Sequence, residues 1–495
     1  MKYHSTRDAS LHYDSSQVIM QGLSREGGLF VPETFPTLST EVLETLISAD
    51  YQSRAVKIMK LFLEDFSEEE LIEYAAKAYA FGQKFDEGAI APVHHVTTGT
   101  EVLELWHGPT CAFKDMALQM LPYLLTASLK KSGEQKTACI LAATSGDTGK
   151  AALEGFCDVD HTKILVFYPR DGVSDIQKLQ MVTQQGNNVG VCSVIGNFDD
   201  AQTGVKKIFS DEALRETLDK KGYFLSSANS INWGRVLPQV VYYISAYCDL
   251  VRDGRISMGE KVNFCVPTGN FGDILAGFYA KIMGLPVNML ICASNSNNVL
   301  TDFIKTGVYD CNRPFFSTES PSMDILISSN LERLLYQLTE SDEEVRGYME
   351  QLSRNGRYQV SDELRKKIQQ NFAAGWCTDK QAAETIAKVF GSEGYLMDTH
   401  TAVAYTVLGE YRKETGDNTL SVVLSTASPY KFCASVLAAL GVTEIQDGTE
   451  VIHQLEEQTR TAAPLPLKSL AEKKVRFTQE TETCDMPKVV LEMLS

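Results

Sequence analysis

The sequence predicts an α/β fold with two doubly wound parallel-sheet domains and a helical amino-terminal region. From residue 137 onward, short apolar runs rich in β-branched or aromatic residues alternate with longer amphipathic segments. This alternation is typical of parallel sheets whose right-handed crossovers place helices on both faces. The chain has 495 residues, which is long enough for two or three domains with cores of their own.

Residues 40 to 85 are expected to be helical, because apolar residues recur at helical spacing after the capping-box pattern Ser67-Glu68-Glu69-Glu70. The strands expected next, in chain order, are Thr137–Ala143, Lys163–Tyr168, Val189–Val194, Lys261–Val266 and Val287–Ala293. The helices expected between them include Asp175–Gln185, Ala201–Asp219 and Asp273–Met283.

The later part of the chain changes character. A charged stretch, roughly 338–380, contains no convincing strand and is interpreted as exposed helices. A strand at Leu420–Leu424 and a helix at Tyr430–Leu440 return to the sheet pattern. We therefore expect an amino-terminal region over 1–100, α/β domains over 101–255 and 256–445, the second with a helical insertion, and a polar tail over 446–495 packed on the outside.

Composition excludes several functional classes. The formal net charge of −18, from 46 basic and 64 acidic residues, argues against nucleic acid as the main partner. The amino terminus lacks the apolar core of a signal peptide, and no apolar run reaches the length of about eighteen residues that a membrane span needs. The 11 cysteines are too scattered for a zinc or disulfide framework. We expect a cytoplasmic protein, free of metal, membrane and nucleic acid.

The stretch HGPTCAFKDMALQ, residues 107–119, places one lysine, Lys114, before a predicted helix. A lysine that attacks a carbonyl must be neutral, whereas an exposed lysine has a pKa near about 10.4. Burial against Trp106, Phe113 and Met116 would lower that pKa and favour a nucleophilic amine. From spacing alone, an ordinary lysine at a helix start is the favoured interpretation.

This stretch resembles the cofactor-lysine motif of threonine synthases, in which the lysine is bonded to pyridoxal 5′-phosphate (PLP). Tyr3, Ser5-Thr6-Arg7 and residues 22–32, GLSREGGLFVP, resemble the amino-terminal signature of the same family. The resemblance implies fold type II of the tryptophan synthase β-like superfamily, with PLP in a cleft between the sheet domains. It also implies that Lys114 is both catalytic and cofactor-binding.

Residues 261–273 are predicted to form a strand, a tight turn and a helix. The first amides of such a helix are unpaired and suit a phosphate group. A helix cap with glycines for packing is an equally good interpretation of the residues alone. The resemblance implies that the loop Gly269-Asn270-Phe271-Gly272-Asp273 binds the PLP phosphate.

A second turn, residues 144–150, follows the strand that ends at Ala143. It fails the nucleotide P-loop pattern, because Thr144 and Ala151 stand where that pattern requires glycine and serine or threonine. It resembles the loop that receives the substrate carboxylate, which implies that Thr144, Ser145, Gly146 and Thr148 bind substrate. Asp147 is awkward beside another carboxylate; it is expected at the cofactor, orienting the loop or meeting the phenolic oxygen.

Two further segments carry the resemblance. The family's counterpart of residues 229–235, NSINWGR, contacts the substrate phosphate, which implies roles for Ser230, Asn232 and Arg235; base rates alone favour a solvated arginine. Residues 424–432, LSTASPYKF, resemble the segment whose first threonine, Thr426, meets the pyridine nitrogen. Many relatives carry histidine in place of Ser428. His400 could be a general base, but a buried, hydrogen-bonded histidine is the favoured interpretation.

The resemblance implies conversion of O-phospho-L-homoserine and water into L-threonine and phosphate, by PLP-dependent γ-elimination and β-addition of water. The expected protein is a monomer or homodimer with this small-molecule substrate. One alternative is a serine or threonine dehydratase-type lyase of the same fold, without a substrate-phosphate site. Others are a non-catalytic metabolite-binding protein and a dehydrogenase, although no Gly-x-Gly-x-x-Gly follows a predicted strand.

Overall fold

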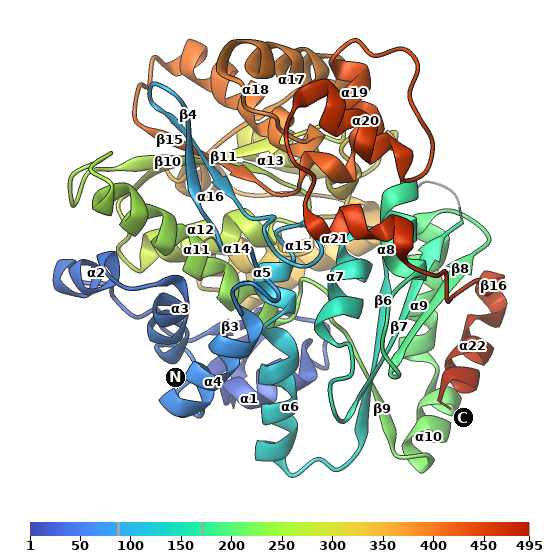
Figure 1. Ribbon diagram of the computed structural model, residues 1–495. Coiled ribbons are helices and arrows are strands. Elements are labelled where there is room, and N and C mark those ends of the chain that lie inside the picture. The colour runs from blue at the N-terminus through green and yellow to red at the C-terminus, as the bar shows by residue number, and fades with distance from the viewer. Residues whose placement is uncertain (87–89, 171–172, 495) are drawn as a thin grey trace.

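The computed structural model describes residues 1–86, 90–170 and 173–494, apart from the side chain of Asp199. Two sheets that are largely or wholly parallel dominate it (Figure 1). The large sheet has the order β14 (Phe372–Trp376), β11 (Val287–Ser294), β10 (Val262–Pro267), β15 (Ser421–Ser425), β5 (Thr100–Glu104), β4 (Val93–Thr97). The small sheet has the order β16 (Glu480–Thr481), β8 (Val189–Val194), β7 (Thr162–Pro169), β6 (Thr137–Ala143), β9 (Tyr223–Ser226).

Both faces of the large sheet are buried, as the near-continuous apolar strands predict. Phe264 and Val266 of β10 belong to one core, with α11 (Trp233–Arg252) and α12 (Gly272–Ile282). Their neighbour Cys265 belongs to a second core, with α17 (Asp379–Glu393) and α18 (Thr399–Thr415). Alternate residues of one strand therefore enter different cores, which confirms the double winding.

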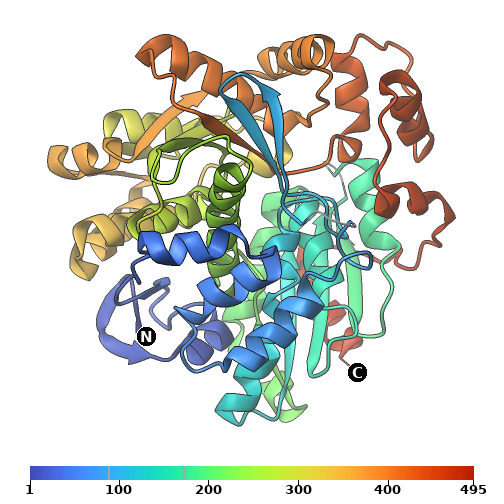
Figure 2. The ribbon, with the colours of Figure 1, turned by 60° about the vertical axis from the view of Figure 1, so that its left-hand side comes forward.

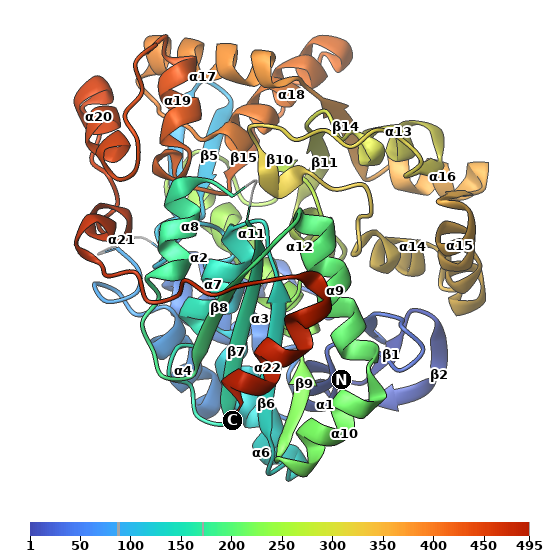
Figure 3. The same cartoon turned by 90° about the vertical axis from the view of Figure 1, so that its right-hand side faces the viewer.

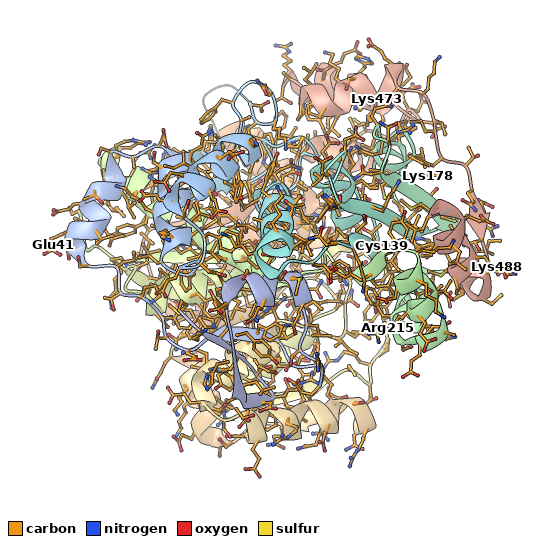
Figure 4. All side chains as sticks on the ribbon, turned by 90° about the horizontal axis from the view of Figure 1, so that it is seen from below. Glu41, Cys139, Lys178, Arg215, Lys473 and Lys488 are labelled. Carbon is orange, nitrogen blue, oxygen red and sulfur yellow. The ribbon has the colours of Figure 1, made fainter. Side chains whose placement is uncertain are left out.

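The small sheet is covered in the same way. Cys139 and Leu141 of β6 pack in a third core with α9 (Phe198–Ser210), α10 (Glu212–Lys220) and α22 (Met486–Met493), which Figure 3 shows over one face of the sheet. Figure 4 places Arg215 of α10 and Lys488 of α22 at the surface beside the region of Cys139. The opposite face packs in the first core with α6 (Leu121–Ser132) and α7 (Asp147–Gly155).

The amino-terminal region is helical, as expected, but it also contains an antiparallel sheet in the order β2 (Asp8–Tyr13), β1 (Tyr3–Ser5), β3 (Phe30–Pro32). Its helices, which come forward in Figure 2, are α1 (Ser15–Gln21), α2 (Thr40–Ile47), α3 (Tyr51–Lys60) and α4 (Glu68–Ala78). The predicted capping box is present, because Ser67 and Glu70 bond reciprocally at the start of α4.

The expected strands all form, within one or two residues at each end. The expectation of no strand in the charged stretch 338–380 is wrong, since β13 (Arg357–Gln359) and β14 both lie there. The centre of β14, Ala373-Ala374-Gly375, is small and weakly apolar, and among the described residues this edge strand pairs with β11 alone. The helix expected at 201–219 is broken at Asp211, whose side chain caps α10.

The tail leaves the large sheet and crosses to the small one, where β16 pairs with β8 and α22 packs beside it (Figure 3). The boundaries at residues 100, 255 and 445 stay a prediction. None of the helices in the described ranges combines the length and apolar character that a bilayer crossing requires.

Candidate active site

The loop that carries Lys114 is attached to the carboxyl end of β15. The backbone N–H of Phe113 donates to the carbonyl of Thr426 at 2.8 Å, and that of Ser428 donates to Cys111 at 3.0 Å. Lys114 directly precedes the short helix α5 (Asp115–Leu118). The lysine therefore sits where strands of the large sheet end, the usual position of ligand sites in open α/β sheets.

The environment of Lys114 favours a neutral amine. Its Nζ lies 4.6 Å from the centre of the Phe113 ring. Burial lowers the pKa of Lys114 to about 8, with Arg235 and Lys431 acting in the same direction and Asp147 and Asp273 opposing them. At pH 7 about a tenth of such amines are neutral, against fewer than about one in a thousand at the ordinary pKa.

A buried carboxyl group holds this loop in shape. Asp115 accepts hydrogen bonds from the backbone N–H and the hydroxyl of Thr110, both at 2.8 Å. A Cβ added at Gly108 would lie 2.6 Å from Asp115 Oδ2, so glycine is required there. Burial raises the pKa of Asp115 to about 6.

The predicted carboxylate loop lies at the end of β6 and the start of α7. Gly146, with φ of +140°, begins the helix without a side-chain cap. The hydroxyl of Thr144 accepts from the N–H of Gly146 at 3.0 Å and of Gly149 at 2.9 Å. Thr144 therefore shapes the loop, while Ser145, Thr148 and the first helical amides are left to meet an anion.

The carboxylate of Asp147 is paired with a buried cation that the sequence did not identify. Its Oδ1 lies 2.7 Å from Nζ of Lys431 and accepts from the side-chain amide of Gln177 at 2.8 Å. Its Oδ2 accepts from the hydroxyl of Ser322 at 3.3 Å. Burial opposes the charge, but Lys431 and Lys114 hold the pKa of Asp147 below its ordinary value. The carboxylate is therefore ionised and compensated.

Sequence analysis missed Lys431, Gln177 and Ser322. They come from η2 (Pro429–Lys431), α8 (Asp175–Val182) and η1 (Pro321–Met323), three segments far apart in the chain. Asp147 itself indicated that a cation should lie nearby, because a carboxylate in an anion-binding loop needs a positive charge to compensate it. The sequence could not say which of the basic residues supplies it.

The predicted phosphate loop joins β10 to α12. Phe271 adopts φ of +63° and precedes α12 without a side-chain cap. The first backbone amides of the helix therefore receive no hydrogen bond from a capping side chain. Gly269 is also needed for packing, because a Cβ there would lie 2.8 Å from the carbonyl of Ser322. The hydroxyl of Ser328 donates to the carbonyl of Gly269 at 2.8 Å, which fixes the turn.

The side chain of Asp273 faces away from this turn. Its Oδ1 accepts from the hydroxyls of Tyr242 at 2.5 Å and Tyr243 at 2.8 Å, whereas its buried Oδ2 has no partner among the described residues. Burial raises the pKa of Asp273 to about 6. A part for Asp273 in binding phosphate, through its backbone N–H, stays a prediction.

Arg235, in the first turn of α11, is the most distinctive group of the site. It is only 3% exposed, its Nη1 donates to the carbonyl of Ala228 at 2.8 Å, and its Nε has no partner among the described residues. Burial alone lowers the pKa of Arg235 to about 10. A buried guanidinium without a carboxylate partner is costly unless an anion fills the place.

The other two predicted phosphate ligands are differently placed. Asn232 caps α11 by accepting from the N–H of Gly234 at 2.9 Å, and its amide donates to the carbonyl of Ile19 at 2.9 Å. Ser230 accepts from the amide of Asn330, whose own N–H donates to the carbonyl of Asn270 at 3.1 Å. Both functional groups of Asn232 are thus engaged, and Asn330 links the two phosphate segments.

Residues of the amino-terminal signature hold the helix that begins directly after Asn330. Glu332, beside Asn330 in α14 (Leu331–Thr339), accepts from the hydroxyl of Thr6 at 2.6 Å and forms a bidentate pair with Arg7. Thr6 and Arg7 therefore position α14.

His400 is buried and hydrogen-bonded on both sides. Its Nδ1 lies 2.7 Å from Oδ2 of Asp398, and its Nε2 accepts from the N–H of Ser322 at 3.2 Å. Accepting at Nε2 requires the neutral ring, with its proton directed to Asp398. This geometry supports the interpretation of a structural histidine. Thr426, also buried, stands at the end of β15 beside the Lys114 loop.

Three family models match the chain. A model of pyridoxal-phosphate dependent enzymes matches residues 102–426, between models of the threonine synthase N terminus, residues 2–79, and of the threonine synthase C-terminal region, residues 401–489. Threonine synthase of Pseudomonas aeruginosa is 38% identical over 438 residues, which cover 88% of this chain and 90% of the relative.

Human threonine synthase-like 1 is 40% identical over 95% of this chain, but the chain spans only 64% of that relative's length. The crystal structure of PLP-bound threonine synthase from Brucella melitensis superposes with a TM-score of 0.88 at 36% identity, covering 100% of this chain and 99% of the other.

Proposed function

The chain belongs to the threonine synthase family of pyridoxal-phosphate-dependent enzymes, and we propose that it converts O-phospho-L-homoserine and water into L-threonine and phosphate. The observation that carries the proposal is the buried, carboxylate-free guanidinium of Arg235, close enough to Lys114 to lower the pKa of its amine. It offers an anion site additional to the phosphate loop of α12, as a phosphorylated substrate requires.

The residues of the site fit PLP. Lys114 offers a buried amine of lowered pKa to the aldehyde, and the uncapped start of α12 offers free amides to the phosphate. The hydroxyl of Thr426, a neutral group, would face the pyridine nitrogen. When bound, the cofactor supplies a conjugated ring that stabilises negative charge at the substrate α-carbon.

The chain's own residues would divide the remaining work. The Thr144–Thr148 loop binds the substrate carboxylate, and Arg235 holds the phosphate at the other end, which orients the carbon chain between them. Lys114 takes the proton from the α-carbon and moves protons at the neighbouring carbon. Phosphate then leaves the γ-carbon, and water supplies the hydroxyl at the β-carbon.

A product assay with the holoenzyme tests the proposal. Equal amounts of L-threonine and phosphate are expected from O-phospho-L-homoserine. A 2-oxo acid with ammonia would instead identify a dehydratase-type lyase. No visible absorption band after PLP addition, together with no turnover, would favour a non-catalytic binding protein.

The Arg235→Ala variant tests the phosphate site. A hydrogen-bonded charge contributes about 1.5–3 kcal/mol, so KM for phosphohomoserine should rise roughly 10- to 150-fold. Arg252→Ala is the matched control, because Arg252 lies on the same helix but is exposed and paired with Asp249. Equal effects of the two substitutions would reject the assignment.

A further inference from the structure

Lys431 is a buried cation at the meeting point of three segments. It is 1% exposed, and it follows β15 in η2. Its Nζ lies 2.7 Å from Oδ1 of Asp147, at the start of α7, and donates to the carbonyl of Thr110 at 2.9 Å. Thr110 belongs to the loop that carries Lys114, so one side chain connects the large sheet, the small sheet and that loop.

We propose that Lys431 is a positioning residue that neutralises Asp147, so that the loop at α7 can accept an anion and the amine of Lys114 loses its proton more readily. The proposal rests on the proposed function, because it concerns the same site. It explains how a carboxylate can occupy a loop that is expected to bind another carboxylate.

The charges that face Lys114 come from four elements. Asp147 of α7 and Asp273 of α12 are acidic, and Arg235 of α11 and Lys431 of η2 are basic. With all four present, the acidic and basic groups balance. Without Lys431, the two carboxylates outnumber Arg235, and a neighbouring negative charge favours the protonated amine.

The alternative for Lys431 is a purely structural pair. Breaking such a pair would destabilise the protein without changing the protonation of Lys114. Two observations favour the positioning role: Lys431 also donates to Thr110 in the loop that carries Lys114, and the charges of both members of the pair act on the pKa of Lys114. The distinguishing measurement is therefore the pH dependence of an event that needs the neutral amine of Lys114.

PLP binding is such an event, and it requires no turnover. In Lys431→Met, affinity for PLP at pH 7 should fall about tenfold, because a smaller share of the Lys114 amine is neutral, and the loss should vanish in alkaline solution as the amine loses its proton. The double variant Asp147→Asn/Lys431→Met leaves neither charge alone and should regain the parent's pH dependence.

Lys150→Met is the matched control, because Lys150 is a buried lysine of the same helix α7 that pairs with Glu154. Its pH dependence of PLP binding should equal the parent's. A folded Lys431→Met with the parent's pH dependence, or with a loss equal at every pH, would overturn the proposal. If Lys431→Met fails to fold, the double variant Asp147→Asn/Lys431→Met provides the test. A PLP affinity at pH 7 that stays below the parent's in this double variant would also overturn the proposal.

The outcome is separable from that of the proposed function. If the holoenzyme releases no threonine from phosphohomoserine, the proposed reaction is wrong. The pH dependence of PLP binding still decides the part played by Lys431, since that measurement contains no substrate.

Discussion

Two buried cations, Lys431 and Arg235, lower the pKa of Lys114, and they differ in one respect. Lys431 is paired with Asp147 at 2.7 Å, whereas Arg235 has no carboxylate partner and leaves its Nε unbonded among the described residues. A buried cation with its own counter-ion is already satisfied, so it can organise a site. A buried cation without one is satisfied only by a ligand. This difference is the basis for proposing that Lys431 positions the site and that Arg235 binds an anion.

Removing the amine of Lys114 should have the largest effect. Lys114→Ala should abolish the covalent attachment of PLP and lower turnover at least about a thousandfold, because nucleophile and base are lost together. Borohydride reduction and mass analysis should find the pyridoxyl group on Lys114 in the parent and nowhere in the variant. An adduct retained by the variant would contradict the assignment.

Breaking the ion pair between Lys431 and Asp147 should reduce the stability of the fold. Lys431→Met leaves Asp147 as a buried, uncompensated charge, which should lower the free energy of unfolding by about 3–5 kcal/mol. Chemical denaturation measures this change, and Asp147→Asn/Lys431→Met should recover most of the loss. If Lys431→Met is as stable as the parent, Asp147 does not depend on Lys431 for compensation of its charge, and the assignment of a buried ion pair is wrong.

Removing Arg235, the unpaired cation, should not reduce the stability of the ligand-free protein. Arg235→Met leaves no uncompensated charge behind and removes only one hydrogen bond, to the carbonyl of Ala228, so the free energy of unfolding of the ligand-free protein should stay constant or rise. With PLP bound, so that the loop of α12 is filled, inorganic phosphate should stabilise the parent against thermal unfolding and have little effect on this variant. A marked loss of stability in ligand-free Arg235→Met would show that the guanidinium is structural, like Lys431.

The smallest effect concerns Asp273, whose raised pKa has a defined sign. Its folded-state pKa of about 6 exceeds the unfolded value of about 4, so the stability it contributes is present below pH 4 and is lost as pH rises through 6. Asp273→Asn should therefore stabilise the ligand-free protein at pH 7 by about 2 kcal/mol and leave it unchanged near pH 4. Unfolding curves at the two pH values measure the difference.

Local pattern sufficed for most of the fold. The alternation of apolar runs and amphipathic segments predicted the core strands β6, β7, β8, β10 and β11. It failed for β14, because the centre of this edge strand, Ala373-Ala374-Gly375, shows no run of β-branched or large apolar residues. It also missed the amino-terminal sheet, whose short strands carry too few residues for a period to be seen.

The sequence by itself determined the chemistry on offer: one lysine before a predicted helix, two glycine-containing turns that each join a predicted strand to a helix, and an arginine at the start of an apolar helix. Only the tertiary structure decided which charges are compensated. Lys431 meets Asp147 across 284 positions because the ends of β15 and β6 come together, whereas Arg235 meets no acidic side chain in the part of the chain that the structure describes. Charge compensation depends on distance in space, and the order of residues along a chain does not fix that distance.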